Sequence, residues 1–251
     1  MGTVLITGCS TGFGRETALH FLNQGWTVVA TMRNPAASTL PPSESLRVLP
    51  LDVTDPHSIA AAVAMAGPVD VLVNNAGIGW FNALEGTSLE AARRIFETNL
   101  FGAVAMMQAV LPGMRERASG VIVSIGSSVI YMPLPMLSVY RASKAALTAL
   151  TESMVPELAP LGIRACVVAP GMAPDTAFAA TTHEQTTAGG SIPEAYADLA
   201  RQMFAQFETA GSGEITSARD VAAAAYRAAT DVDCPVVLPA GPDAIAWSQQ
   251  R

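Results

Sequence analysis

The segment TGCSTGFG, from Thr7 to Gly14, lies between an apolar run that ends at Ile6 and a segment of helical periodicity that begins at Arg15. Glycine-rich turns between a strand and a helix commonly bind phosphate, because backbone N–H groups and the positive end of the helix attract anions. The Gly-Lys-Ser/Thr sequence of a nucleoside-triphosphate loop is absent here. The segment therefore favours a dinucleotide as ligand, and an ordinary glycine-rich turn is the alternative that the glycines alone leave open.

The spacing of the three glycines, Gly-x-x-x-Gly-x-Gly, assigns a task to each of them. Gly8 permits a tight turn, Gly12 lets the backbone approach a pyrophosphate, and Gly14 allows close packing of the helix on the strand. After a strand, this spacing serves the same physics as the better-known Gly-x-Gly-x-x-Gly.

The end of the next apolar run bears on the type of dinucleotide. It reads Ala30-Thr31-Met32-Arg33-Asn34, and no carboxylate follows before Glu44. NAD sites usually place a carboxylate here to hold the ribose 2′-hydroxyl, whereas an arginine accommodates the 2′-phosphate of NADP. Arg33 therefore favours NADP(H) over NAD(H), and a solvated strand end is its other interpretation.

Short apolar runs alternate with longer alanine-rich segments of helical period along the whole chain. The expected strands are Thr3–Thr7, Thr27–Thr31, Leu46–Leu51, Val69–Asn74, Gly120–Ile125, Arg164–Ala169 and Pro235–Leu238. The expected helices are 12–24, 56–66, 88–116, 140–160 and 217–230. Strands that are apolar on both faces and separated by helices indicate a parallel sheet that is covered on both sides. We therefore predict an α/β fold, a single-domain (1–251) Rossmann-type doubly wound parallel sheet of about seven strands with helices on both faces.

Two connections in this pattern are irregular. Segment 34–45 contains three prolines and is too short for a full crossover helix. The region 171–216 lies between the last two expected strands and contains a helix-like patch near 193–207 with a tyrosine and two phenylalanines. Long insertions of this kind are usually functional. We predict a substrate-binding lid around 171–216.

The composition of the chain excludes several classes of partner. Of its 251 residues, 50% are hydrophobic and 14% charged, which suits a large core and a buried subunit interface. A net charge of -7 and a pI near 4.9 argue against nucleic acid or an anionic membrane as partner. Three distant cysteines without a C-x-x-C pair and three scattered histidines indicate no disulfide framework and no metal site. With no signal-peptide pattern and no long apolar run, we expect a cytoplasmic protein.

Tyr140 and Lys144 stand four residues apart in a segment that is expected to be helical, so both lie on one face. The pKa of a free tyrosine is about 10, and a nearby ammonium group lowers it. The pair can therefore act as a tuned proton donor and acceptor. Taken alone, such a pair on a helix surface could also be incidental.

The order of motifs along the chain narrows these interpretations. In sequence they are TGCSTGFG, Asn74-Asn75-Ala76-Gly77, Asn99, Ser127 thirteen residues before Tyr140, Lys144, and Pro170-Gly171. This pattern closely resembles the classical short-chain dehydrogenase/reductase family over nearly the whole chain. The TGCSTGFG segment and Ala30-Thr31-Met32-Arg33-Asn34 are most similar to its hydroxysteroid and retinol dehydrogenase-like branch.

The resemblance implies a catalytic set of four residues. Tyr140 would be the acid/base, and Lys144 would hold the nicotinamide ribose and lower the pKa of the tyrosine. Ser127 would donate a hydrogen bond to the substrate carbonyl oxygen, with Ser128 as the other candidate for this role. Asn99 would help to hold a water molecule that links Lys144 to solvent.

The resemblance also implies a set of cofactor contacts. Ser10 and Thr11 would lie near the adenosine phosphates, Asp52 and Val53 near the adenine, and Arg33 at the 2′-phosphate. From the residues alone, Asp52 is equally a turn residue or a neighbour of a helix N-terminus. The full expected set is Gly8, Ser10, Thr11, Gly12, Phe13, Gly14, Arg33, Asp52, Val53, Asn75, Ala76, Gly77, Tyr140, Lys144, Pro170, Gly171 and Thr176.

One position departs from the family pattern. The family often has a threonine five residues after the proline of its Pro-Gly pair, where it binds the nicotinamide carboxamide. Asp175 occupies that place here, and the threonine is Thr176. Either residue is a candidate for the contact.

Together these features predict hydride transfer between NADP(H) and a carbonyl or secondary alcohol, with a hydrophobic substrate and a homodimer or homotetramer. An NAD-dependent dehydrogenase of the same family is the nearest alternative. A nucleotide-sugar epimerase or dehydratase usually has a longer C-terminal domain, whereas only about a dozen residues follow the last expected strand. A non-catalytic cofactor-sensing regulator would typically lose Tyr140 or Lys144.

Overall fold

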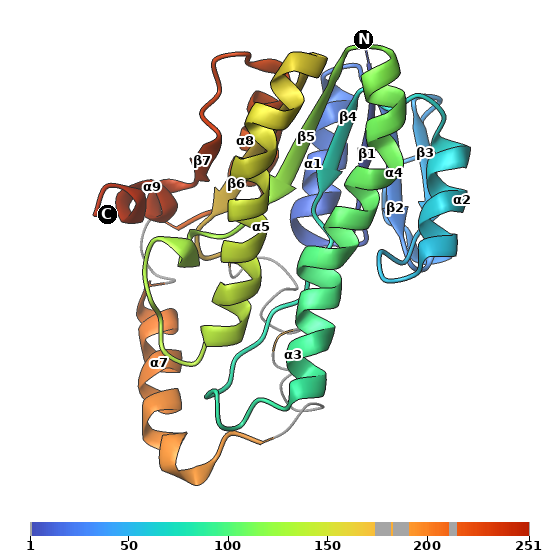
Figure 1. Cartoon of the computed structure of the whole chain (residues 1–251). Coiled ribbons are helices and arrows are strands. Elements are labelled where there is room, and N and C mark those ends of the chain that lie inside the picture. The colour runs from blue at the N-terminus through green and yellow to red at the C-terminus, as the bar shows by residue number, and fades with distance from the viewer. Residues whose placement is uncertain (1, 174–181, 183–190, 211–214, 251) are drawn as a thin grey trace.

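A parallel β-sheet forms the centre of the protein (Figure 1). The computed structural model describes residues 2–173, 182, 191–210 and 215–250. Its strands are β1 (Thr3–Ile6), β2 (Thr27–Met32), β3 (Leu46–Pro50), β4 (Val71–Asn74), β5 (Gly120–Ile125), β6 (Ile163–Pro170) and β7 (Val237–Ala240). They pair in parallel in the order β3-β2-β1-β4-β5-β6-β7. The predicted doubly wound sheet is confirmed, and β7 begins two residues later than we expected.

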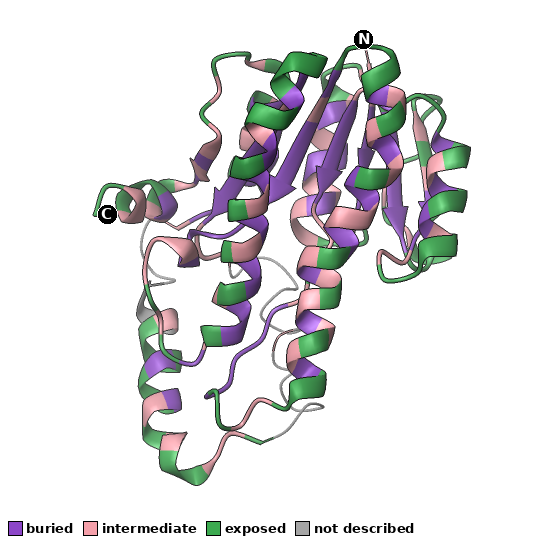
Figure 2. Ribbon diagram, viewed as in Figure 1, coloured by how far each residue is buried: buried purple, intermediate pink, exposed green. Residues whose placement is uncertain are grey.

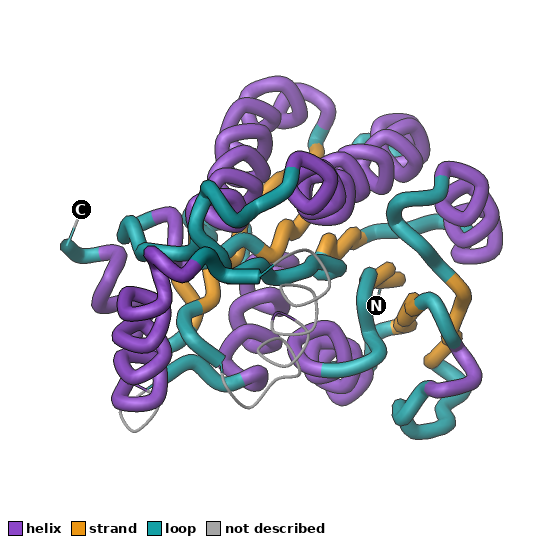
Figure 3. Tube along the Cα trace, turned by 90° about the horizontal axis from the view of Figure 1, so that it is seen from below, coloured by secondary structure: helices purple, strands orange, loops and turns teal. Residues whose placement is uncertain are grey.

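Helices cover both faces of this sheet (Figure 3). They are α1 (Gly12–Asn23), α2 (Pro56–Ala66), α3 (Leu89–Phe96), α4 (Gly102–Glu116), α5 (Ser138–Leu158), α7 (Ala197–Ala210), α8 (Ala218–Thr230) and α9 (Pro242–Ser248). Successive side chains of a strand point to opposite faces. Thus Leu5 of β1 packs in the cluster that includes α2, α4 and α5, whereas Val4 and Ile6 pack in the one that includes α1 and α8. Figure 2 shows that the central strands between these layers are largely buried.

The strand order reverses between β1 and β4, and this reversal positions the site. From β1 the chain passes through α1 to β2, whereas from β4 it passes through α3 and α4 to β5, on the other side. The loops after β1 and β4 therefore diverge at the carboxyl edge of the sheet, where such folds form a ligand crevice. The loop after β1 is the TGCSTGFG segment, and the loop after β4 begins at Asn75.

The predicted helix 88–116 is present as Leu89–Glu116, but it is not α-helical throughout. A π-helical turn, Glu97–Phe101, separates α3 from α4. Such turns are frequent at functional sites, and this one contains Asn99. One wider helical turn changes the apolar periodicity too little to be seen in the sequence, so the pattern predicts a continuous helix here.

This helical stretch is also notable for its apolar character. Within the described residues, Leu89–Glu116 is long and apolar enough to cross a membrane by length and composition alone. Core helices of globular proteins pass the same test, and α4 places Met106, Met107 and Met114 in the core beside the sheet. The absence of a membrane partner stays a prediction.

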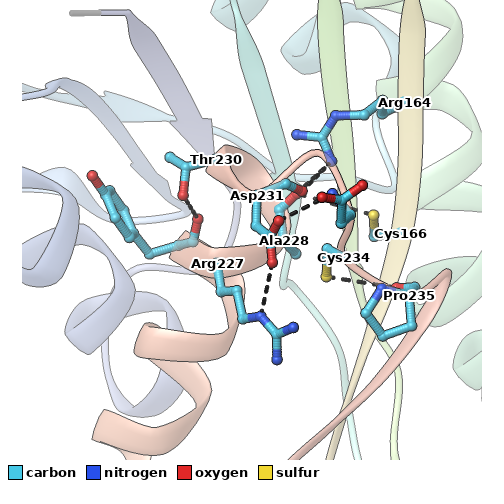
Figure 4. A network of polar contacts seen from close by, with 10 residues as sticks. Arg164, Cys166, Arg227, Ala228, Thr230, Asp231, Cys234 and Pro235 are labelled. Carbon is cyan, nitrogen blue, oxygen red and sulfur yellow. Dashed lines mark hydrogen bonds and ion pairs between the residues drawn. The ribbon is translucent and has the colours of Figure 1, made fainter.

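Arg164 of β6 anchors the C-terminal end of α8 (Figure 4). Its guanidinium donates hydrogen bonds to the carbonyl oxygens of Ala228 at 3.1 Å, Ala229 at 2.7 Å and Asp231 at 3.0 Å. The last carbonyls of a helix lack partners within the helix. Arg164 therefore satisfies them and fixes α8 against the sheet.

The predicted short connection after β2 and the helix-like patch near 193–207 are both confirmed. Segment 34–45 forms only a 3₁₀ turn, Pro35–Ala37, and the patch forms a 3₁₀ turn, Glu194–Tyr196, followed by α7. Residues 174–181, 183–190 and 211–214 of the predicted lid lie outside the described residues. The lid as a whole stays a prediction.

Candidate active site

The TGCSTGFG loop leaves bare backbone at the start of α1. Gly8 and Gly12 have positive φ angles of 73° and 56°, which side chains other than glycine rarely adopt. A Cβ at Gly14 would overlap the carbonyl oxygen of Gly8. The first turn of α1 carries no acidic residue, and Ser10 and Thr11 are exposed beside it. A loop of this form fits a pyrophosphate, because free backbone N–H groups and the positive end of the helix dipole attract anions.

The loop after β4 holds the glycine loop in place. The side-chain amide of Asn75 donates hydrogen bonds to the carbonyl oxygens of Thr7 at 2.8 Å and Gly8 at 3.0 Å. In return, the Thr7 hydroxyl oxygen accepts from the backbone N–H groups of Asn75 and Ala76, at 3.0 and 2.9 Å. Asn75 and Ala76 therefore brace the predicted phosphate loop, a task that the sequence pattern did not indicate.

Tyr140 and Lys144 lie on the inner face of α5, and both are buried. The Ser127 side chain, which follows β5, forms a hydrogen bond with the phenol of Tyr140. The ammonium group of Lys144 donates a 2.8 Å hydrogen bond to the carbonyl oxygen of Ile125. The fold thus brings Ser127, Tyr140 and Lys144 together, and the contact with Tyr140 favours Ser127 over Ser128.

Asn99 and Gly77 complete this cluster. Asn99 accepts a hydrogen bond from the N–H of Ile78 at 2.8 Å and donates to the Ile78 carbonyl oxygen at 3.0 Å. A Cβ placed on Gly77 would lie 3.2 Å from Asn99 Oδ1 and 3.4 Å from Lys144 Nζ. Gly77 is exposed, so its lack of a side chain leaves these two polar atoms beside the crevice.

Ser143 is a member of the cluster that sequence reasoning missed. Its hydroxyl lies 3.1 Å from Asn99 Nδ2, from which it accepts, and donates to the Tyr140 carbonyl oxygen at 2.7 Å. It is fully buried one position before Lys144. The serine itself is visible in the motif Tyr-Arg-Ala-Ser-Lys. Its partner Asn99 becomes apparent only from the packing of α5 on the π-helical turn.

The pKa of Tyr140 moves opposite to the direction that the resemblance implied. Burial raises the pKa of Tyr140 to about 12, and the hydrogen bond from Ser127 offsets only part of this rise. Burial likewise lowers the pKa of Lys144 to about 8. Desolvation is the larger of the two effects because the phenol is buried. Both side chains are thus held toward their neutral forms.

The predicted adenosine end lies around the loops after β2 and β3. Asp52 Oδ1 accepts from the N–H and hydroxyl of Thr54 at 2.9 and 2.7 Å, which is a turn, one of the two interpretations left open by its sequence. These bonds lower the pKa of the Asp52 carboxyl, and the positive charge of Arg33 adds to the effect. Arg33 and Asp52 are therefore neighbours. Val53 contacts Gly102 at the start of α4.

Three of the predicted cofactor residues belong to the end of β6 or the segment that follows it, and the structure describes two of them. Pro170 ends β6 at the carboxyl edge, and the N–H of Gly171 donates to Thr216 Oγ1 at 3.1 Å. Thr176 and its alternative Asp175 lie outside the described residues. Within the described part of the chain, no group of three or more His, Cys, Asp or Glu side chains is arranged to hold a metal ion.

Comparison with known proteins gives concordant results. Residues 2–187 match the family profile described as short chain dehydrogenase. Human retinol dehydrogenase 8 is 43% identical over 180 residues, which cover 67% of this chain and 58% of the relative. Rat estradiol 17-beta-dehydrogenase 1 is 38% identical over 234 residues, which cover 86% and 66%. The chain thus spans less than two thirds of the length of these relatives.

Solved structures agree in fold. A short-chain dehydrogenase from Streptomyces avermitilis superposes with a TM-score of 0.84 at 32% identity, covering 100% of this chain and 92% of that one. A short chain dehydrogenase from Burkholderia cenocepacia in complex with NADP has a TM-score of 0.78 at 25% identity, with coverages of 99% and 91%. On the family match, these relatives and the fold, the chain belongs to the short-chain dehydrogenase/reductase family of NAD(P)-dependent oxidoreductases, in its hydroxysteroid and retinol dehydrogenase branch.

Proposed function

We propose that the protein transfers a hydride between NADP(H) and the carbonyl or secondary alcohol of a hydrophobic substrate. The observation that carries the proposal is the cluster of Ser127, Tyr140 and Lys144, held together at the sheet edge that also bears the glycine loop. Bound NADPH would supply the hydride for the carbonyl carbon, and every proton movement falls to side chains of this chain.

Tyr140 is the proton donor of the reduction in this proposal. With a pKa of about 12 its phenol is neutral at physiological pH, so it has a proton to give to the oxygen of the reduced carbonyl. The Ser127 hydroxyl stabilises that developing alkoxide by a hydrogen bond. Lys144 lies one turn further along the buried face of α5, and its ammonium form, the main one at pH 7, favours the negative charge of the phenolate left behind.

Lys144 and Asn99 form the route by which the proton is replaced. Both present a polar atom next to the exposed Gly77, so the interior of the cluster reaches the crevice there. Asn99 is held by hydrogen bonds to Ile78 and Ser143, which fix its Oδ1 atom beside Gly77. Asn99 thereby positions the proton path and takes no part in bond making.

The preference for NADP(H) rests on Arg33. The positive charge of Arg33 interacts with the Asp52 carboxylate, at the end of the site where the adenosine would lie. A 2′-phosphate bound there would be a second anionic partner for Arg33. A charge-assisted hydrogen bond of this type contributes about 1.5–3 kcal/mol. The structural neighbour from Burkholderia cenocepacia was solved in complex with NADP, so a related fold holds this cofactor.

A hydrophobic substrate agrees with the apolar side chains that gather beyond the cluster. Phe81, Met136 and Met203 are buried together where α7 packs over the loops after β4 and β5, and the rings of Phe81 and Phe204 lie 4.6 Å apart. Tyr140 itself packs in an adjacent apolar group with Trp80. Two relatives are named for retinol and estradiol, both of them apolar alcohols.

We further propose that the enzyme is a cytoplasmic homodimer or homotetramer. The low share of charged residues, 14%, favours a buried subunit interface. Light scattering of the purified protein measures the state directly, and a monomer at micromolar concentration would contradict this part of the proposal.

The experiment that tests the function follows the oxidation of NADPH and, separately, NADH with a panel of ketones, aldehydes, diketones and steroid-like carbonyls. Turnover with NADPH preferred is the expected result. Turnover with NADH preferred would contradict the Arg33 assignment and leave the catalytic cluster standing. Binding of cofactor without turnover of any substrate would favour a cofactor-sensing regulator.

A further inference from the structure

A compact group of hydrogen bonds ties the segment after β6 to the C-terminal part of the chain. The N–H of Gly171 donates to Thr216 Oγ1 at 3.1 Å, and the N–H of Met172 donates to Asp243 Oδ2 at 2.6 Å. The hydroxyl of Thr216 lies 2.6 Å from Asp243 Oδ1, which accepts from it. We refer to Gly171, Met172, Thr216 and Asp243 as the Asp243 clamp.

The packing of the Asp243 clamp is specific. A Cβ on Gly171 would overlap the Asp243 carboxylate, and a Cβ on Gly241 would overlap the Thr216 hydroxyl. Gly241 also has a φ of +94°, which favours glycine. Thr216 is 1% exposed, and its hydroxyl lies 2.9 Å from the Ala240 carbonyl oxygen as well as 2.6 Å from Asp243 Oδ1, which is the nearer acceptor. Two glycines thus make room for the contact between hydroxyl and carboxylate.

The clamp lies at the edge of the sheet that bears Ser127. The N–H of Gly126 donates to the Val168 carbonyl oxygen at 2.7 Å, which ties the segment carrying Ser127 to β6. The strand ends two residues later at Pro170, and Gly171 and Met172 follow immediately. The backbone that the clamp holds is therefore an extension of the strand beside the catalytic cluster, at the end of the crevice opposite Arg33.

The clamp also joins the two ends of a long insertion. Gly171 precedes and Thr216 follows most of the segment that separates β6 from α8. A carboxylate that accepts from a backbone N–H and a buried hydroxyl forms charge-assisted bonds, which are about twice as strong as neutral ones. Asp243, at the first turn of α9, holds Met172 directly and Gly171 through Thr216, whereas the Ala240 carbonyl oxygen accepts from Gly171 as well, at 3.3 Å.

We propose that Asp243, together with Thr216, is a positioning residue for hydride transfer, which fixes the backbone of Gly171 and Met172 against the nicotinamide half of the cofactor. This inference rests on the oxidoreductase function proposed above. Asp243 touches neither the substrate nor the reacting atoms. It acts by holding the backbone segment that would position the nicotinamide next to Tyr140.

The test compares Asp243→Ala with Asp220→Ala. Asp220 closes the capping box at the start of α8, so its loss destabilises the same region without touching the clamp. Two properties are measured besides turnover, namely hydrogen exchange of the Met172 amide in the ligand-free protein and the dissociation constants of two ligands. The ligands are the full cofactor, NADPH, and its adenosine half, 2′,5′-ADP.

For Asp243→Ala we expect Met172 to exchange roughly tenfold faster or more, and NADPH to bind roughly tenfold more weakly. Binding of 2′,5′-ADP should be unchanged, because the adenosine end is remote from the clamp. Asp220→Ala should leave the Met172 exchange and the ratio of the two dissociation constants unchanged. Asp243→Asn, which keeps one acceptor oxygen, should restore part of the affinity for NADPH.

Equal weakening of NADPH and 2′,5′-ADP, or no weakening of either, would overturn the role of Asp243. If Asp243→Ala does not fold, Thr216→Val removes the hydroxyl with little change of shape and is measured in the same way. Failure of the wild-type protein to bind or turn over any nicotinamide cofactor would instead contradict the proposed function. The two failures are therefore distinguishable.

Discussion

The ammonium group of Lys144 donates a 2.8 Å hydrogen bond to the backbone carbonyl of Ile125, the last residue of β5, and the side chain is 5% exposed. A carbonyl oxygen compensates a buried positive charge only in part, and burial lowers the pKa of Lys144 to about 8. The fold therefore holds this lysine at a cost in stability. Such a cost is expected at sites where function requires a charge.

Replacing Lys144 with methionine should stabilise the fold and abolish turnover. The pKa of Lys144 is about 8 in the folded protein against 10.5 without burial, so the unfolded state binds more protons between these values. The contribution of Lys144 to the free energy of unfolding should therefore rise between about pH 8 and pH 10.5, by up to about 3 kcal/mol. It is measured as the difference between wild type and Lys144→Met, because burial raises the pKa of the Cys9 and Cys166 thiols to about 12 and about 11, which lowers the stability of both proteins above pH 9. Urea unfolding at pH 7 and pH 10 tests this expectation.

In Lys144→Met that rise should be absent, and at pH 7 the variant should be more stable than the wild type. Ala145→Met, at an exposed position of the same helix, is the matched control for adding a methionine. Equal stability of Lys144→Met and wild type at pH 7, with the same dependence on pH, would contradict the account of a destabilising buried charge.

The two directions of the reaction should respond differently to pH. Reduction needs the neutral phenol of Tyr140, which persists up to a pKa of about 12, so reduction should not gain from raising the pH. Oxidation needs the phenolate as proton acceptor, so its rate should increase as the pH rises toward that pKa. Steady-state rates in both directions between pH 6 and pH 10 provide the measurement.

Tyr140→Phe removes the phenol hydroxyl and should abolish both rates while leaving the affinity for cofactor in place. Tyr226→Phe, on α8 away from the cluster, is the control. Near-wild-type turnover of Tyr140→Phe would refute the assignment of the proton donor. A reduction rate that climbs with pH in the wild type would contradict the raised pKa.

The order of strands and helices was predictable because it follows from local patterns. Apolar runs of strand length and alanine-rich helical segments alternate, and burial of both sheet faces leaves few other topologies. The positions of Tyr140 and Lys144 were predictable for the same reason, since a four-residue spacing on a helix fixes a common face. No comparable local pattern exists for Ser143, whose partner Asn99 is distant in the chain.

Three features required the folded chain because they depend on packing. The direction of the Tyr140 pKa follows from enclosure of the phenol, which no spacing in the sequence encodes. The π-helical turn around Asn99 interrupts a stretch whose apolar pattern is continuous. Asp243 stands in the first turn of a short helix, where an acidic residue is ordinary, and only the folded structure places it against Met172.

Arg33→Ser should reduce the preference for NADPH over NADH. Loss of one charge-assisted contact to a 2′-phosphate weakens NADPH binding by about 1.5–3 kcal/mol, or roughly 10- to 150-fold, with little effect on NADH. The ratio of kcat/KM for the two cofactors measures this change. Arg219→Ser removes an exposed arginine from α8 and should leave the ratio unchanged. Equal losses with both cofactors would mean that Arg33 does not read the phosphate.

Gly14→Ala should abolish cofactor binding with the rest of the fold intact. The added methyl group would overlap the Gly8 carbonyl oxygen and the Asn75 amide, the two groups that brace the turn of the glycine loop. To relieve this overlap, α1 must move away from β1, which displaces the N–H groups at its start from any bound phosphate. Titration of tryptophan fluorescence with NADPH measures the loss of affinity.

Gly113→Ala is the control for Gly14→Ala, because a Cβ there meets only the flexible end of the Arg117 side chain, at 3.2 Å. Alanine also favours the helix more than glycine by about 1 kcal/mol, so this variant should bind NADPH normally and unfold at a slightly higher temperature. Normal binding by Gly14→Ala would show that the loop tolerates displacement of α1. In that case the close packing of Gly14 on Gly8 would serve stability alone, and the phosphate would have to be held by groups other than the N–H donors at the start of α1.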